Sequence, residues 1–218
     1  MKQTILFSNV VGNIYSDQTT DCEFNQNLQK VLKNSIKPNS NLVFINAPGF
    51  VNDNLYFEKI INCFNKINIV FDNTIELSDT TKQTQLKSFE TQNRVYFLMG
   101  GNPITQLELI KFYNLEQTIK NHDGVVIGFC AGAINVSKYS IITSDGDFEK
   151  PFWYHGLGRI DISIEPHFDY DNTEFTQNRV AEINNFCKQL ETNIYAIPDR
   201  SVINIYDKIE FLGEVYKF

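Results

Sequence analysis

The segment of residues 124–136 places a single thiol between a strand-like run and a set of small residues. It reads GVVIGFCAGAINV, so that Cys130 follows the apolar run and precedes Ala131 and Gly132. The five letters GFCAG fit the pattern glycine, any residue, nucleophile, any residue, glycine, which is typical of a sharp strand-to-helix turn that exposes a nucleophile. The alternative is that Cys130 is a small, inert core residue beside a tight turn, because free cysteines are commonly buried.

A nucleophile at such a turn needs backbone donors for the oxyanion that forms when it attacks a carbonyl. The N–H group of Ala131, directly after the thiol, is one expected donor. The strand-like run that ends in Gly100-Gly101-Asn102 forms a second glycine turn. We expect both turns at the carboxyl edge of one sheet, where open α/β sheets place their sites, with the Gly100-Gly101 turn as the supplier of the second donor.

A thiol nucleophile also requires a base that accepts its proton. His167 ends an alternating strand-like segment and follows Pro166, so its ring is expected to be held rigidly toward a cleft. His155 is the main competitor because it lies in an irregular segment, and His122 has the surroundings of an exposed turn. The interpretation of His167 as a surface or capping residue stays open.

The base is usually oriented by a carboxylate. Asp199 lies in a turn between two short strand-like runs and is the preferred candidate, although aspartate is also a common turn residue. Asp169 and Asp171 are further candidates that lie very close to His167 in sequence.

The elements that must position these residues alternate between strands and helices. Strands are expected at 4–10, 41–47, 68–77, 94–101 and 124–129 and within 194–218, and helices at 54–67, 104–120, from 131 and at 174–192. The alternation predicts an α/β fold with a mainly parallel sheet sandwiched between helices and extra C-terminal strands at one edge. Residues 1–218 are expected to form one domain. The segment 137–160 is the least regular and is expected to form a flap over the site.

Composition narrows the class of partner. The hydrophobic content of 42% is sufficient for a well-filled core. The net charge is −7 and the positive charges are scattered, which argues against nucleic acid or an anionic membrane as the main partner. Four cysteines lie far apart with no CxxC pair, which fits a reduced, cytoplasmic protein without a zinc site. No metal or organic cofactor is expected.

Four segments of the chain resemble one known family. The segments FLMGGNPITQLELI, GVVIGFCAGAINV, GLGRIDISIEPHFD and IYAIPDRSVINI occur in the order and approximate spacing of the peptidase E (α-aspartyl dipeptidase) and cyanophycinase family. The resemblance runs from about Phe97 to Ile205, with a weaker match of the first three strands. It implies a fold similar to that of class I glutamine amidotransferases and the activity of a serine-type hydrolase.

The resemblance also implies roles for individual residues. Cys130 stands at the position of the family's nucleophilic serine, His167 at that of its histidine, and Asp199 at the place of a glutamate. Gly101 and Ala131 match the oxyanion donors. Substrate binding is assigned to a further set: Asn102, Arg179 and Arg200.

Two departures separate the chain from the family pattern. Cysteine replaces serine, which gives a larger, more acidic and more nucleophilic group. Aspartate replaces glutamate, which shortens the reach to His167 by one methylene. No arginine lies in a clear motif for an aspartyl side chain, so aspartyl specificity does not follow from the resemblance.

The order of the residues along the chain discriminates between two classes of hydrolase. Nucleophile, histidine and acid run 130, 167, 199, whereas α/β-hydrolases place the acid before the histidine. In an α/β-hydrolase, the acid would be one of the aspartates that precede His167 in the chain: Asp145, Asp147 or Asp161.

The sequence therefore predicts a cytoplasmic hydrolase of small peptides or amides, a monomer or homodimer, that acts through a covalent acyl-enzyme. One alternative is a glutamine amidotransferase-like amidase that releases ammonia. Another is a catalytically weak or inactive homologue that serves as a binding or redox-sensing protein.

Overall fold

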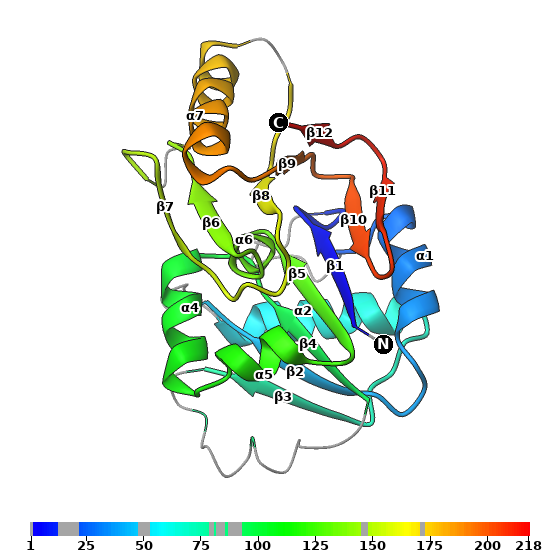
Figure 1. Cartoon of the computed structure of the whole chain (residues 1–218). Coiled ribbons are helices and arrows are strands. Elements are labelled where there is room, and N and C mark those ends of the chain that lie inside the picture. Colours follow the sequence, from blue (N-terminus) through cyan, green and yellow to red (C-terminus); the bar gives the residue numbers. More distant parts are fainter. Residues whose placement is uncertain are drawn as a thin grey trace.

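The computed structural model describes residues 2–12, 22–47, 53–78, 81, 86, 93–144, 148–170 and 173–218, and all structural statements concern these residues. The elements in chain order are β1 (Gln3–Phe7), α1 (Gln26–Ser35), β2 (Asn41–Ile45), α2 (Asp53–Lys66), β3 (Asn73–Leu77), β4 (Arg94–Leu98), α4 (Pro103–Phe112), α5 (Glu116–Asn121), β5 (Val125–Phe129), α6 (Ala131–Asn135), β6 (Tyr139–Ile142), β7 (Phe152–His155), β8 (Ser163–Pro166), α7 (Glu174–Leu190), β9 (Ile194–Ile197), β10 (Val202–Ile205), β11 (Ile209–Leu212) and β12 (Tyr216–Lys217). Figure 1 labels them along the chain.

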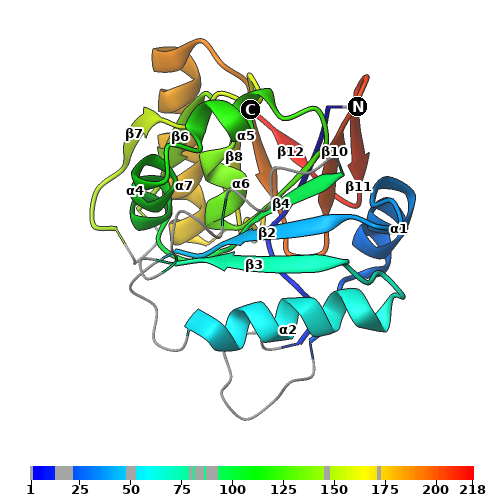
Figure 2. The same cartoon turned by 90° about the horizontal axis from the view of Figure 1, so that it is seen from below.

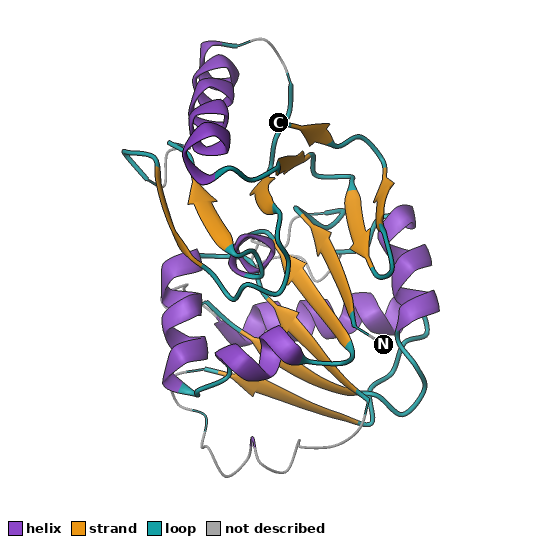
Figure 3. Ribbon diagram, viewed as in Figure 1, coloured by secondary structure: helices purple, strands orange, loops and turns teal. Residues whose placement is uncertain are grey.

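A seven-stranded sheet forms the centre of the molecule (Figure 3), with the strand order β11-β10-β1-β5-β4-β2-β3. The five strands from β1 to β3 in this order run parallel. The other two strands extend the sheet beside β1: β10 pairs antiparallel with β1, and β11 pairs antiparallel with β10. The predicted fold class, a mainly parallel sheet with extra C-terminal strands at one edge, is confirmed.

Helices cover both faces of this sheet, so the residues of its inner strands are buried almost throughout. In β1, Phe7 belongs to the core cluster that contains residues of α1 and α2, whereas Leu6 belongs to the cluster that contains residues of α4 and α5. Leu6 and Phe7 face opposite sides of the sheet because successive residues of a strand point to opposite faces. Figure 2 shows α2 beneath the sheet and α4 on the other side.

Two smaller sheets stand beside the carboxyl edge of the central sheet. One joins β8, β9 and β12, and α7 packs on it through Ile183 and Phe186. The other is the antiparallel pair β6–β7, in which Tyr139 pairs with His155 and Ile141 with Trp153. The sequence predicted irregular structure for 137–160. That prediction was wrong for β6 and β7, because β-branched and aromatic residues paired across strands stabilise a sheet.

Two helix predictions also need correction. The helix expected at 104–120 is divided into α4 and α5, and Asn114 between them has a φ of 56° in the left-handed region. The helix α1 was not predicted, although its apolar residues Leu28, Val31 and Leu32 have helical spacing and Asn25 caps its first turn.

Candidate active site

Cys130 occupies a strained turn between β5 and α6. Its φ is 49° and its ψ is −108°, in a region that a residue with a Cβ rarely adopts. The turn is held by backbone bonds: the Cys130 N–H group donates to the Phe7 carbonyl at 3.0 Å, and the Cys130 carbonyl accepts from Ala133 at 2.9 Å. The backbone therefore fixes the direction of the thiol before any substrate binds.

The small residues around Cys130 have a steric cause. A Cβ atom added at Gly132 would lie 2.1 Å from the Leu98 carbonyl oxygen, and one added at Gly128 would lie 2.8 Å from the Ala133 nitrogen. Both neighbours are backbone atoms, which cannot move aside. Glycine is thus required for α6 to start so close to β4 and β5.

The second glycine turn lies beside the first. Gly101 has a φ of 126°, which favours glycine. Asn102 then caps α4, because its side-chain oxygen accepts from the N–H groups of Ile104 and Thr105, and Pro103 takes the first helical position. Gly101, Asn102 and Ala131 all line the same pocket as Cys130.

A buried polar network joins the two turns. Gln106 on α4 donates to the Met99 carbonyl at the end of β4 at 2.6 Å. Asn135 on α6 donates to the Gln106 side chain at 3.0 Å and to the Pro103 carbonyl at 2.8 Å. Tyr154 on β7 donates to Asn135 at 2.7 Å. Gln106 and Asn135 are fully buried, so this network fixes the spacing of the turns, and the sequence analysis missed it.

His167 follows β8 and points its ring toward Cys130. Its Nδ1 atom lies 2.6 Å from Oδ1 of Asp199, and its ring also forms a hydrogen bond with the Cys130 side chain. The other oxygen of Asp199 accepts from Asn9, which follows β1, at 2.9 Å. The structure thus brings Cys130, His167 and Asp199 together in one chain of hydrogen bonds, and it adds Asn9, which no sequence signal singled out.

The pKa of His167 is raised to about 10. Burial acts in the opposite direction, but the hydrogen bonds to Asp199 and Cys130 and the charges of these two groups outweigh it. The pKa of Asp199 is lowered, chiefly by its hydrogen bond to His167 and, against the effect of burial, also by Asn9. The site therefore favours a charged imidazolium paired with the carboxylate of Asp199 at neutral pH.

Arg179 does not line the pocket; it lies behind His167. Its guanidinium pairs with Glu165, a nearly fully buried carboxylate, and donates to the carbonyls of Pro166 and His167 at 3.0 Å each. Thr143 donates to the same carboxylate at 2.6 Å. Since His167 has a left-handed φ of 53°, the bonds from Arg179 hold its strained backbone in place. This placement argues against the substrate-binding role predicted for Arg179.

A pocket of about 560 Å³ opens at the thiol. It is lined by Gly101, Asn102, Pro103, Cys130, Ala131, Ile134, Ile141, Ile142, Thr143, Phe148, Glu165, Pro166 and His167. Part of the segment expected to form a flap therefore does border the site. Arg200, predicted to bind substrate, is exposed and is not among the lining residues.

The competing bases and acids lie elsewhere or outside the described residues. His122 binds the Arg94 carbonyl at 2.8 Å, at the opposite edge of the parallel strands, and His155 is exposed on β7. Asp161 and Asp169 are exposed. The predictions for Asp145, Asp147 and Asp171 fall outside the described residues.

Two further properties concern cofactors and membranes. Among the described residues, no group of three or more His, Cys, Asp or Glu side chains could hold a metal ion. Within the same part of the chain, none of the helices is sufficiently long and apolar to cross a membrane.

A parallel α/β sheet with a nucleophile-elbow turn at its carboxyl edge defines a class of hydrolytic enzymes. The family model of peptidase family S51 matches residues 14–210, and the chain belongs to this family. It is therefore a peptidase-type hydrolase, and the predicted kinship to peptidase E is confirmed.

One solved structure supports the fold. A 1.5 Å crystal structure of a candidate peptidase E from Listeria monocytogenes EGD-e is 18% identical in sequence, with a TM-score of 0.60. The match covers 100% of this chain and 98% of the other. No curated protein matches the chain by sequence.

Proposed function

We propose that this chain hydrolyses small peptides or amides through a covalent thioester on Cys130, with His167 as acid and base and Asp199 as the group that orients His167. The observation that carries the proposal is the continuous hydrogen-bonded chain from Cys130 through His167 to Asp199 at a strained turn. A structural cysteine requires neither the strained backbone nor a charged histidine beside it.

The thiolate is the reactive form of Cys130, and the charged ring of His167 beside it would stabilise that form. The sulfur of Cys130 attacks the substrate carbonyl and forms a C–S bond, while the negative charge moves to the carbonyl oxygen. The N–H groups of Gly101 and Ala131 stabilise that oxyanion; Ala131 begins α6, so its N–H group has no intrahelical acceptor. The C–N bond then breaks, and His167 gives its proton to the departing amine.

Water completes the reaction. His167, now neutral, takes a proton from a water molecule that attacks the thioester carbonyl. The C–S bond breaks, the acid leaves, and the thiolate and the imidazolium are restored. Asp199 and Asn9 keep the ring in the orientation that both proton transfers need.

The direct test compares peptide hydrolysis by the wild type, Cys130→Ala and Cys187→Ala. Cys187 is a matched control, because it is also a partly exposed free cysteine but lies on α7 outside the pocket. Cys130→Ala is expected to lower kcat/KM by a factor on the order of 10³ or more, and Cys187→Ala is expected to change it little. Equal rates for all three proteins would remove Cys130 as the nucleophile.

A trapped intermediate tests the covalent step. Rapid acid quenching during turnover of an activated ester should add the mass of the acyl group to one peptide, the one that contains Cys130. Cys130→Ser should retain weak hydrolysis and form an ester instead of a thioester. Turnover without an acyl adduct on either variant would contradict the acyl-enzyme.

The wild type and the same variants also distinguish the two alternative functions, a glutamine amidase and a sensor or binding protein. A glutamine amidase would release ammonia from glutamine in a reaction that Cys130→Ala abolishes. A sensor or binding protein would react with iodoacetamide at Cys130 but turn over none of the peptides or amides offered.

A further inference from the structure

The walls of the pocket beyond the thiol are apolar. They come from segments far apart in sequence: Pro103 on α4, Ile134 on α6, Ile141 and Ile142 on β6, Phe148, and Pro166 on β8. Ile141 is fully buried and Ile142 nearly so, while Phe148 is partly exposed. A side chain that enters beside Cys130 therefore meets hydrocarbon over most of its surface.

The polar residues of the pocket are already bound to protein groups. The side-chain oxygen of Asn102 accepts from two N–H groups of α4. Thr143 donates to Glu165 at 2.6 Å, and Glu165 is paired with Arg179. A polar substrate side chain that bound the Asn102 oxygen or the Glu165 carboxylate would have to compete with these bonds.

The charges of the pocket oppose an acidic side chain. Glu165 and His167 are the charged or titratable lining residues other than the thiol, within the described part of the chain. The guanidinium closest to them, Arg179, lies behind the pocket wall and is matched by Glu165. The imidazolium of His167 is likewise matched by Asp199. A substrate carboxylate would therefore lose its water next to another carboxylate and without an unmatched cation, which is unfavourable.

We infer that the pocket selects peptides or amides whose acyl residue carries a neutral, mainly apolar side chain, and that it rejects aspartyl and glutamyl substrates. This inference rests on the proposed function, because it describes the residue whose carbonyl Cys130 attacks. It also explains why the arginine candidates Arg179 and Arg200 both lie outside the pocket lining: a neutral side chain needs no cation.

The test uses three dipeptides that differ only in the first residue: Leu-Leu, Asn-Leu and Asp-Leu. The side chains of Leu, Asn and Asp have the same branched shape and differ in polarity and charge. We expect kcat/KM at neutral pH to fall in the order Leu, Asn, Asp, with at least a tenfold difference between Leu and Asp. Equal values, or faster cleavage of Asp-Leu, would overturn the inference.

Variants at Phe148 test whether the pocket wall causes this order of kcat/KM values. Phe148→Arg places a cation in the wall at a partly exposed position and should raise kcat/KM for Asp-Leu relative to Leu-Leu. Phe148→Ala is the matched control, since it removes the ring without adding charge and should lower the rate for Leu-Leu only. If both variants changed the two substrates by the same factor, the wall would not determine specificity.

Alkylation of Cys130 separates failure of this inference from failure of the proposed function. Leucyl and aspartyl chloromethyl ketones should modify Cys130 at different rates, leucyl faster, even if no peptide is cleaved; intact mass measures both. Absence of any Cys130-dependent cleavage together with faster leucyl labelling would reject the hydrolase and keep the selectivity. Equal labelling or faster aspartyl labelling would reject the selectivity whether or not the chain is a hydrolase.

Discussion

At the scale of residues, two side chains of the proposed triad sit on backbones that proteins rarely use. Cys130 and His167 both have positive φ values, 49° and 53°. Strain of this kind persists only where the surrounding structure enforces it. At Cys130 the enforcement comes from the backbone hydrogen bonds to Phe7 and Ala133, and at His167 from Arg179.

The raised pKa of His167 leads to a prediction about pH. A pKa of about 10, above the ordinary value of 6.5, means that the ring stays protonated through neutral pH and loses its proton only in alkaline solution. In the proposed mechanism the protonated His167 donates to the leaving amine, so kcat/KM should fall as the pH rises through about 10. In Asp199→Asn the pKa should drop toward 6.5, the alkaline limb should move to lower pH, and activity should fall by about 10³- to 10⁴-fold.

NMR titration of the His167 ring measures this pKa independently of activity. Asn9→Ala is the milder control, since it removes one hydrogen bond to Asp199 but leaves the bond between Asp199 and His167. In Asn9→Ala the pKa of His167 should also fall, but by less than in Asp199→Asn. An unchanged His167 pKa in Asp199→Asn would show that Asp199 does not raise the pKa of His167.

At the scale of elements, the carboxyl ends of three parallel strands assemble the site. Asn9 follows β1, the Gly101 turn follows β4, and Cys130 follows β5. His167 and Asp199 come from the ends of β8 and β9, which pair in parallel in a separate sheet. The same rule that places ligands at the carboxyl edge of open α/β sheets thus positions both halves of the site.

Much of this arrangement could be predicted from sequence, for identifiable reasons. Glycines around Cys130 and at Gly101 mark turns that no other residue can form, so both turns were predicted. The partners Asn9, Gln106 and Asn135 could not be predicted, because single polar residues carry no periodic signal and their bonds span distant segments. Arg179 was assigned to substrate because sequence cannot show that a nearby carboxylate already neutralises it.

The Arg179–Glu165 pair yields a prediction about stability and catalysis. Both side chains are buried, so Arg179→Met leaves an unpaired carboxylate and should lower the free energy of unfolding by about 3–5 kcal/mol. The double variant Glu165→Gln/Arg179→Met removes the charge and should regain part of that loss. Its kcat should stay low, since the bond to the His167 carbonyl is still missing.

Urea unfolding and steady-state kinetics on the same preparations measure the two effects. Recovery of kcat in parallel with stability would show that Arg179 acts only on the fold. Stability regained without kcat would identify Arg179 as a positioning residue for His167.

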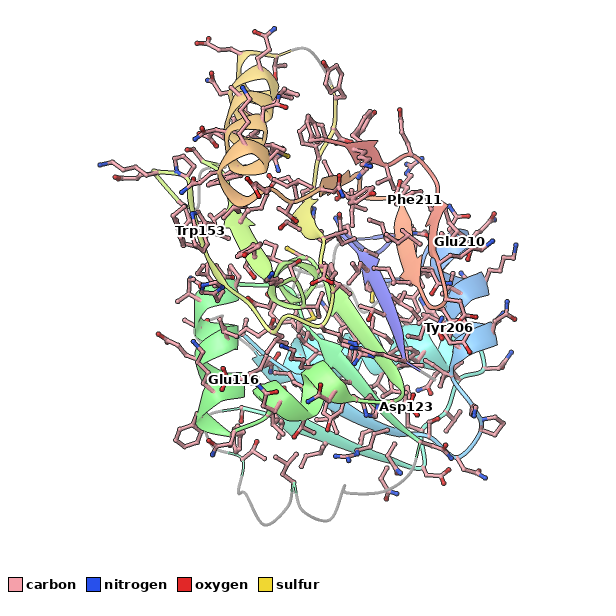
Figure 4. All side chains as sticks on the ribbon, viewed as in Figure 1. Glu116, Asp123, Trp153, Tyr206, Glu210 and Phe211 are labelled. Atoms are coloured by element: carbon pink, nitrogen blue, oxygen red, sulfur yellow. The ribbon has the colours of Figure 1, made fainter. Side chains whose placement is uncertain are left out.

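At the scale of the whole molecule, the net negative charge agrees with the proposed preference of the pocket for neutral side chains. The net charge is −7, and Figure 4 shows labelled acidic residues on distant parts of the surface, with Asp123 and Glu116 toward the α5 side and Glu210 on β11. Such a field slows the approach of anions and favours neutral or cationic substrates. Long-range charge and the local lining of the pocket thus act in the same direction.

A pair of buried thiols lies where two segments distant in sequence meet in the core. The sulfur atoms of Cys22 and Cys63 lie 2.7 Å apart and both residues are fully buried. The hydrogen bond from Cys63 lowers the pKa of Cys22, whereas the same bond and burial raise that of Cys63. Cys22 is therefore the thiolate that would attack an oxidant, with Cys63 beside it as the second thiol.

Refolding in the presence of glutathione disulfide should join these two residues. The two thiols lose two electrons and two protons to one glutathione disulfide, which leaves as two reduced glutathiones, so the intact mass falls by two hydrogens. The cross-link should raise the free energy of unfolding by about 2–4 kcal/mol, because it restricts the unfolded chain between Cys22 and Cys63. Peptide mapping without reductant identifies the pair. Cys63→Ala should show neither the loss of mass nor the rise in the free energy of unfolding. If both thiols of the refolded protein still reacted with iodoacetamide after unfolding, the predicted bond would not form.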